Sequence, residues 1–163
     1  KEIESEFEKL RPSIELKIQA RIPDDYISSP ELKIEAYRKM AYAEKEKEIK
    51  DLEWELEDRY GAPPTMVQNL LKIVLLRILA KDKGIRSIST EPRGIAIELE
   101  EGIHWNKESL EPLLRQYQGR LFLSGRGTPR LILNSRDASE GKLLSWLEKI
   151  LRTVEIERTG WKP

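Results

Sequence analysis

The sequence predicts an α+β fold: a single compact domain with a central buried helix, several further helices and a small, mainly antiparallel sheet. Three observations predict it. The segment from Pro64 to Asp82 is apolar nearly all round, as expected of a buried helix. Short runs with strand character follow that segment and are separated by turn residues. Strands and helices do not alternate regularly, which favours α+β over a doubly wound parallel sheet.

Two elements are expected before the first long helix. Apolar residues at helical spacing in KEIESEFEKL predict a linker helix over residues 1–12, ahead of the domain proper over residues 13–163. From Ile14 to Ile22 apolar residues alternate strictly with polar ones. This period of two predicts a strand with one buried face.

Two helices should follow this strand. Ser29 and Pro30 supply an N-cap and a proline at the first helical position, so a helix begins there. A second apolar stripe ends at Tyr60, before Gly61, which can adopt the left-handed conformation that closes a helix. The sequence leaves open whether the two helices are continuous near Ala43.

After the central helix the pattern changes to strands and turns. Residues 85–90 and 95–100 flank the turn Glu91-Pro92-Arg93-Gly94, which predicts a hairpin. Asn106 should cap a helix that continues to Tyr117.

The last part of the chain is predicted to hold two more strands and a final helix. The strands are Leu121 to Leu123 and Arg130 to Leu133, joined by a hairpin turn at Gly125-Arg126-Gly127-Thr128. Asp137 is predicted to cap a helix that ends near Leu151, and the tail after it has no clear pattern.

Composition excludes several classes of function. Lys plus Arg and Asp plus Glu each number 29, so net charge gives no general attraction to nucleic acid or membranes. The chain has no cysteine, which excludes disulfides, thiolate nucleophiles and cysteine-based metal sites. No apolar run approaches the roughly 20 residues of a membrane helix. We therefore expect a soluble, cytoplasmic, monomeric protein.

The residues that catalysis usually requires are mostly missing. His104 is the one histidine, so we expect it to be structural or simply exposed. The turn at Gly125-Arg126-Gly127-Thr128 is neither a phosphate loop nor a dinucleotide fingerprint. We therefore expect no enzyme, no cofactor and no metal.

The helix that ends at Gly61 carries the most specific signal. At 100° per residue, Trp54 and Asp58 project away from its apolar stripe, and Glu55 lies on the flank. An outward tryptophan indicates a protein interface. However, Glu55 and Arg59 are also spaced as an ordinary i,i+4 ion pair, and Trp54 could lie beneath a neighbouring element. These residues alone leave both readings open.

Three segments resemble the carboxy-terminal domain of the bacterial transcription-repair coupling factors. They are IPDDYI, LKIEAYRKMA and ELEDRYGAPPTMVQNLL, and the resemblance covers residues 13–84. It implies a non-catalytic module at the end of an ATP-dependent DNA translocase that removes stalled RNA polymerase and recruits nucleotide excision repair. In that family the module docks on a UvrB-like module of the same polypeptide and masks its UvrA-binding surface. UvrA and RNA polymerase are then indirect partners.

The resemblance also implies which residues form that contact. The E-L-x-D-R-[FY]-G segment of the family carries over to Glu55, Asp58 and Arg59. Two departures are small: Tyr60 stands where Phe is common, and Glu57 where an apolar residue is frequent. The resemblance therefore favours the interface reading of this helix.

A basic segment supports an alternative function, direct nucleic-acid binding. Between Pro112 and Arg136 there is no acidic residue, and Tyr117 and Phe122 are interleaved with arginines. The arginines are Arg115, Arg120, Arg126, Arg130 and Arg136. The same residues would suit an acidic partner protein, or could serve solubility alone, so direct DNA contact stays open.

Overall fold

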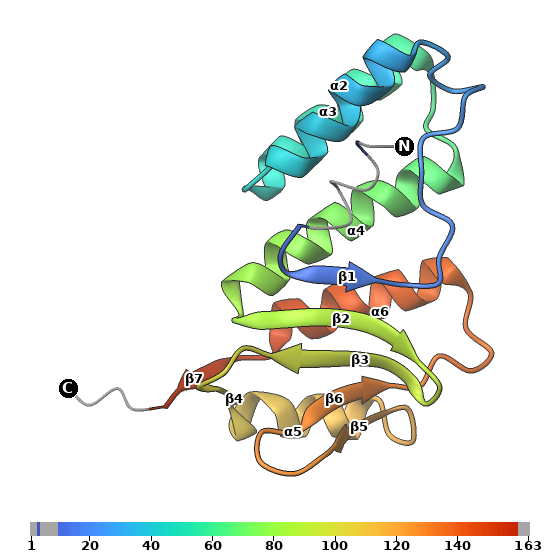
Figure 1. Cartoon of the computed structure of the whole chain (residues 1–163). Helices are drawn as coiled ribbons and strands as arrows, with labels where there is room; N and C mark the ends of the chain where they lie inside the picture. Colours follow the sequence, from blue (N-terminus) through green and yellow to red (C-terminus); the bar gives the residue numbers. More distant parts are fainter. Residues whose placement is uncertain (1–2, 4–9, 160–163) are drawn as a thin grey trace. The chain divides into compact units, whose positions relative to one another are not determined.

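The computed structural model describes residue 3 and residues 10–159, so most of the predicted linker helix lies outside the described residues. The chain divides into two compact units. Unit 1 contains residues 17–78, and unit 2 contains residues 11–16 and those from 79 onward. Figure 1 shows their elements. The predicted boundary between residues 12 and 13 stays a prediction.

Unit 1 is helical. It contains α2 (Pro30–Tyr42), α3 (Glu46–Tyr60) and α4 (Thr65–Asp82) as far as Ile78. The predicted central helix is thus confirmed as α4. The side chains of the unit 1 core come from all three helices and from the segment before them: Ile22, Ile27, Ala36, Tyr37, Met40, Ile49, Leu52, Leu56, Val67, Leu70, Leu71 and Val74.

The ends of these helices follow the sequence signals. The Ser29 side chain accepts a hydrogen bond from the Leu32 N–H, as predicted for an N-cap. Gly61 ends α3 with φ +88°, and its N–H donates to the Glu57 carbonyl. Ala43 is extended and ends α2, so α2 and α3 are two separate helices.

The predicted strand from Ile14 to Ile22 is wrong beyond Glu15. Strand β1 contains Ser13–Glu15 only, because it pairs with just three residues of β2 before the chain passes into unit 1. The apolar alternation continues for a different reason. Ile22 is buried in the unit 1 core, and its N–H donates to the Tyr37 hydroxyl at 3.0 Å.

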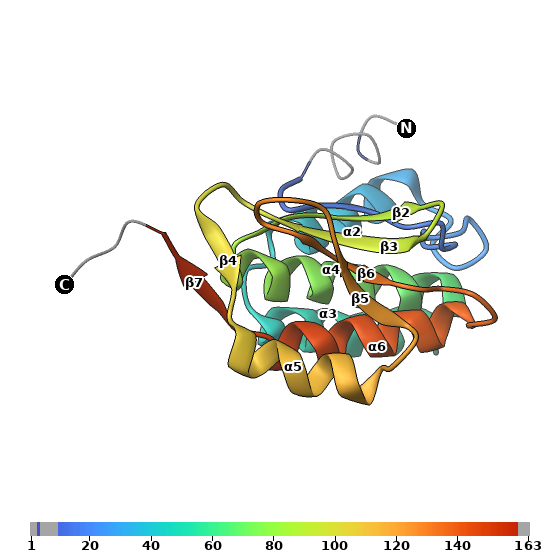
Figure 2. The same ribbon diagram turned by 90° about the horizontal axis from the view of Figure 1, so that it is seen from below.

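Unit 2 is built on a five-stranded sheet in the order β1-β2-β3-β6-β5, in which only the β1–β2 pair is parallel. Besides β1, its strands are β2 (Ile85–Glu91), β3 (Gly94–Leu99), β5 (Leu121–Ser124) and β6 (Arg130–Leu133). Helices α5 (Lys107–Gln116) and α6 (Glu140–Thr153) lie on one side of this sheet (Figure 2). The α+β prediction and both predicted hairpins are confirmed.

Two details of unit 2 differ from the sequence prediction. The cap of α6 is Ser139, whose side chain accepts from the Lys142 N–H. Asp137 cannot cap the helix, because its φ of +58° lies outside the extended region that an N-cap requires. The predictions also omitted the antiparallel pair β4 (Ile103–Trp105) and β7 (Ile156–Arg158), which are too short to show a period.

Candidate protein interface on α3

Helix α3 has a buried face and an exposed one, as predicted. Ile49, Leu52 and Leu56 are buried, whereas Trp54 is 70% exposed and Asp58 is exposed. Trp54 therefore does not lie beneath a neighbouring element of the described chain. We call Trp54, Glu55, Asp58 and Arg59 the outer face of α3.

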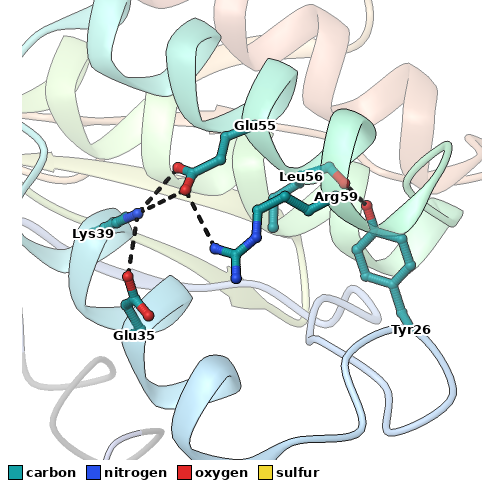
Figure 3. Close-up of polar contacts among 6 residues, drawn as sticks. All are labelled: Tyr26, Glu35, Lys39, Glu55, Leu56 and Arg59. Carbon is teal, nitrogen blue, oxygen red and sulfur yellow. Dashed lines mark hydrogen bonds and ion pairs between the residues drawn. The ribbon is translucent and has the colours of Figure 1, made fainter.

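Glu55 is the centre of an ion-pair network in unit 1 (Figure 3). Lys39 of α2 donates to both Glu55 carboxylate oxygens, at 2.9 and 3.0 Å. Arg59 donates to one of them at 3.4 Å, which confirms the predicted i,i+4 pair. Lys39 also lies 3.5 Å from Glu35. The carboxylate of Glu55 is therefore shared between two cations of its own unit.

The network shifts the titration of its members. The hydrogen bond from Lys39 holds the pKa of the Glu55 carboxyl below its usual range, and the same bond raises the pKa of Lys39. Both side chains keep more than a third of their surface in solvent, at 36% and 43%. Water and salt screen such an ion pair, so either side chain can leave it for a different charged partner at little cost in free energy.

A groove of about 550 Å³ lies between α2 and α3, with Glu55 in its wall. Ile34, Tyr42 and Leu52 give it an apolar lining. Its charged lining is mostly acidic: Glu31, Glu35, Glu48, Asp51 and Glu55 against Arg38 and Lys39. The surface beside the outer face is thus amphipathic and negative.

Tyr26 fixes the last turn of α3, which carries Asp58 and Arg59. Its hydroxyl lies within hydrogen-bond distance of two carbonyl oxygens, that of Leu56 at 3.2 Å and that of Gly61 at 2.9 Å. The hydroxyl is a donor at neutral pH because the ordinary Tyr pKa is about 10, and burial raises the pKa of Tyr26 further. The position of the outer face is therefore set by a residue outside the helix.

The Arg59 side chain is oriented as well. Its guanidinium carbon lies 5.2 Å from the centre of the Tyr60 ring, a cation–π arrangement. Tyr60 in turn packs against Tyr26, with ring centres 5.7 Å apart.

The members of the outer face differ in how far the described chain already engages them. Within residues 10–159, Asp58 has no ion pair, and Trp54 has no ring or hydrogen-bond partner. Glu55 and Arg59 are already paired.

Lys39 and Glu35 were not predicted from the sequence as members of this network. Their i,i+4 spacing was a readable signal, but the Lys39–Glu55 contact joins residues 16 positions apart and depends on how α2 and α3 pack.

The five arginines of the predicted basic segment lie in different environments. Arg115, Arg126 and Arg136 are exposed. Arg120 donates to backbone carbonyl oxygens, and Arg130 forms an ion pair with Glu91 at 2.5 Å. The structure therefore does not present the five side chains as one uniform surface.

Side chains suited to other kinds of site are sparse in the described part of the chain. His104 is exposed in β4, with its Nδ1 atom 3.1 Å from the Thr128 hydroxyl. Residues 10–159 contain no group of three or more His, Asp or Glu side chains placed to hold a metal ion. No helix among them is long and apolar enough to cross a membrane.

Comparison with known proteins gives a consistent result. The TRCF domain family model matches residues 16–110, more than half of the chain. The transcription-repair-coupling factor of Escherichia coli K12 is 32% identical over 143 residues, which are 87% of this chain and 12% of that protein. The factor of Mycobacterium bovis is 38% identical over 76 residues, or 47% of this chain and 6% of that protein.

A solved structure agrees in fold. The crystal structure of a transcription-repair coupling factor C-terminal domain matches with a TM-score of 0.74 and 22% identity, covering 86% of this chain and 89% of that one. The chain spans about an eighth of the length of its curated E. coli relative. The resemblance predicted from the three sequence segments is confirmed, and the chain belongs to the TRCF domain family.

Proposed function

We propose that this chain is a regulatory, non-catalytic domain of a cytoplasmic transcription-repair coupling factor. It docks through the outer face of α3 on a UvrB-like module of the same polypeptide and masks the UvrA-binding surface there. UvrA and RNA polymerase are then indirect partners, and nucleotide hydrolysis belongs to another part of the parent protein. The observation that carries this proposal is the exposed Trp54 beside Asp58, which has no ion pair within residues 10–159, on a helix whose end is fixed.

The outer face suits a contact between modules. Trp54 offers a large rigid surface, the kind that concentrates binding energy at the centre of an interface. Asp58 offers a carboxylate without a cation in the described chain, so it would pair with a basic residue of the partner. Arg59 and Glu55 would contribute by exchanging internal pairs for external ones.

The network around Glu55 also suits a contact that must open. When the partner leaves, Lys39 and Arg59 still neutralise Glu55, so this carboxylate is not left without a partner. Such a contact has little intrinsic affinity. Tethering within one polypeptide supplies an effective concentration that can reach the mM range, which is enough for a weak interface to close.

The test uses the full-length parent protein and capture by immobilised UvrA. Wild type should be captured poorly, and Asp58→Ala/Arg59→Ala should be captured as well as a variant that lacks the whole domain. Glu55→Ala should act in the same direction. Truncating one member of an interfacial charge pair costs about 2–5 kcal/mol when the pair is buried, which exceeds what a weak clamp can lose.

Glu111→Ala/Arg115→Ala is the matched control. It removes one exposed acid and one exposed base from α5 of unit 2, and capture should stay at the wild-type level. If deletion of the domain raises capture while the α3 variants do not, the clamp uses another surface. If deletion itself changes nothing, the domain does not mask UvrA binding.

A further inference from the structure

A second polar groove lies in unit 2. It has a volume of about 430 Å³ and lies where β3 begins, beside β5 and the loop after β6. Its lining includes Arg93, Phe122, Asn134, Ser135 and Arg136. None of the described residues that line it is acidic. The groove therefore offers two guanidinium groups, an amide and a hydroxyl.

Arg93 is held in place on one side of this groove. Its guanidinium donates to the Ser124 hydroxyl at 2.8 Å, and its central carbon lies 4.9 Å from the centre of the Phe122 ring. Both contacts orient the side chain without neutralising it. Binding a ligand here costs less side-chain entropy than binding one at an arginine that is free to move, because Arg93 is already ordered.

The loop on the other side is fixed by a third arginine. Arg120 donates to the carbonyl oxygens of Asn134 and Arg136, at 2.7 and 3.0 Å. Its guanidinium also lies 4.6 Å from the Trp146 ring. The Asn134 side chain accepts from the Arg136 N–H at 2.9 Å. Arg120 thus orders the loop and places its own positive charge next to it.

Arg130 differs from the arginines at the groove, because a carboxylate neutralises it. Glu91 neutralises Arg130 at 2.5 Å. Within the described chain, the guanidinium groups of Arg93 and Arg120 bond to neutral groups, and neither these two arginines nor Arg136 has a carboxylate partner. Two arginines line the groove and a third lies beside its loop, all without a carboxylate partner in the described chain, which suits the groove to an anion.

We propose that this groove binds the phosphodiester backbone of nucleic acid without reading its bases. Guanidinium forks, a hydroxyl and an amide match phosphate oxygens, and such contacts position a backbone independently of sequence. This binding does not depend on the proposed docking through α3.

The test uses this chain alone and measures its binding to a fluorescein-labelled DNA duplex of about 20 base pairs by fluorescence anisotropy, in salt from about 50 to 200 mM. Two unrelated sequences should bind equally well. Two phosphate contacts predict a slope of about −1.8 for log K against log salt, which is about a tenfold loss over this range. Arg93→Gln/Arg136→Gln should reduce affinity at least about tenfold at low salt and bring the slope close to zero.

Two further variants separate a built site from diffuse charge. Arg115→Gln/Arg126→Gln removes the same net charge from exposed positions that do not line the groove, and it should lower affinity less than about threefold. Phe122→Leu leaves the charge unchanged but removes the ring contact that helps to orient Arg93, and it should lower affinity about threefold. The thermal midpoint of each variant shows that it is folded.

Three results would overturn the proposal. The first is no binding of duplex or single-stranded DNA by the wild type at low salt. The second is equal loss of affinity in the two double arginine variants, which would mean diffuse attraction. The third is tighter binding of a polyglutamate peptide than of DNA, which would assign the groove to an acidic protein partner.

Discussion

The two candidate sites, one in each unit, differ in whether their charged side chains are paired with opposite charges. In unit 1, the Glu55 carboxylate is paired with Lys39 and Arg59, so these three charges offset one another. In unit 2, Arg93 and Arg120 bond to neutral hydroxyl and carbonyl groups and keep their full charge. Internal pairing suits a contact that forms and releases, whereas unpaired, oriented cations suit a standing attraction to a polyanion.

The units also differ in what holds their backbone together. Residues 17–78 of unit 1 contain no strand, so its three helices are joined by side-chain packing and a few polar bonds. Unit 2 adds the hydrogen bonds of a five-stranded sheet. Loss of one core side chain should therefore be felt most in unit 1.

The largest effect is expected from Leu71→Ala in α4. Leu71 is buried in the unit 1 core, and truncating a buried leucine costs about 2–5 kcal/mol through the cavity left behind. Hydrogen exchange should accelerate more at the amides of α2 and α3 than at those of β3 and β6. Denaturant unfolding followed by fluorescence gives the change in the free energy of unfolding.

Leu131→Ala is the matched change in unit 2, where Leu131 is fully buried in β6. It should accelerate exchange in β3 and β5, its ladder neighbours, more than in α2. If either substitution accelerates exchange equally everywhere, the chain opens as one cooperative body and the comparison of two units fails.

The sequence predicted well where structure depends on neighbouring residues. Ser29, Pro30 and Gly61 delimit helices through local bonds and backbone angles, and the apolar stripe that ends at Tyr60 located the outer face of α3. Asp137 shows the limit of this reasoning. Two residues with capping side chains stand close together, and only the backbone conformation decides that Ser139 is the cap.

Contacts between distant residues could not be predicted in the same way. Lys39 meets Glu55 only because α2 and α3 pack side by side, and β4 meets β7 across more than 50 residues. The basic segment was visible as composition, but the sequence could not show that Glu91 neutralises Arg130, or that Arg93 joins Arg136 at one groove. Counting charges along the sequence predicts that a surface is basic, but only the tertiary structure shows which of its charges have no ion-pair partner.

An intermediate effect is expected from Tyr26→Phe. The substitution removes the hydroxyl that bonds the Leu56 and Gly61 carbonyls, a loss of about 0.5–1.5 kcal/mol for a hydrogen bond of this kind. The last turn of α3 should fray, so UvrA capture by the full-length protein should rise. Thermal unfolding and the capture assay measure the two consequences.

Tyr42→Phe controls for the loss of a tyrosine hydroxyl. Tyr42 is 77% exposed and its hydroxyl has no hydrogen-bond partner in the described chain, so neither stability nor capture should change. If Tyr26→Phe also leaves both unchanged, the outer face is positioned by the α3 backbone alone.

The smallest effect, and the most direct test of exchangeable pairing, is expected from Glu55→Gln. The folded-state pKa of Glu55 is depressed, so its ionised form stabilises the fold above the ordinary Glu pKa of about 4.3. That contribution is lost as pH falls through the lower folded-state pKa. Wild type should therefore exceed Glu55→Gln in stability near neutral pH, and the difference should shrink as the pH falls below the ordinary Glu pKa of about 4.3 or in about 1 M salt.

Lys39 determines how the stability difference between wild type and Glu55→Gln ends at high pH. Its pKa is raised in the folded state, so its contribution is complete below the ordinary Lys pKa of about 10.4 and is lost only as pH rises through the higher folded value. Because both side chains are more than a third exposed, the difference should stay well below about 1 kcal/mol. Glu53→Gln, an exposed change on the same helix, is the control and should leave stability near neutral pH unchanged. A difference well above that limit would make the Lys39–Glu55 pair a structural requirement of unit 1, and Glu55 could then not leave Lys39 to bind a partner.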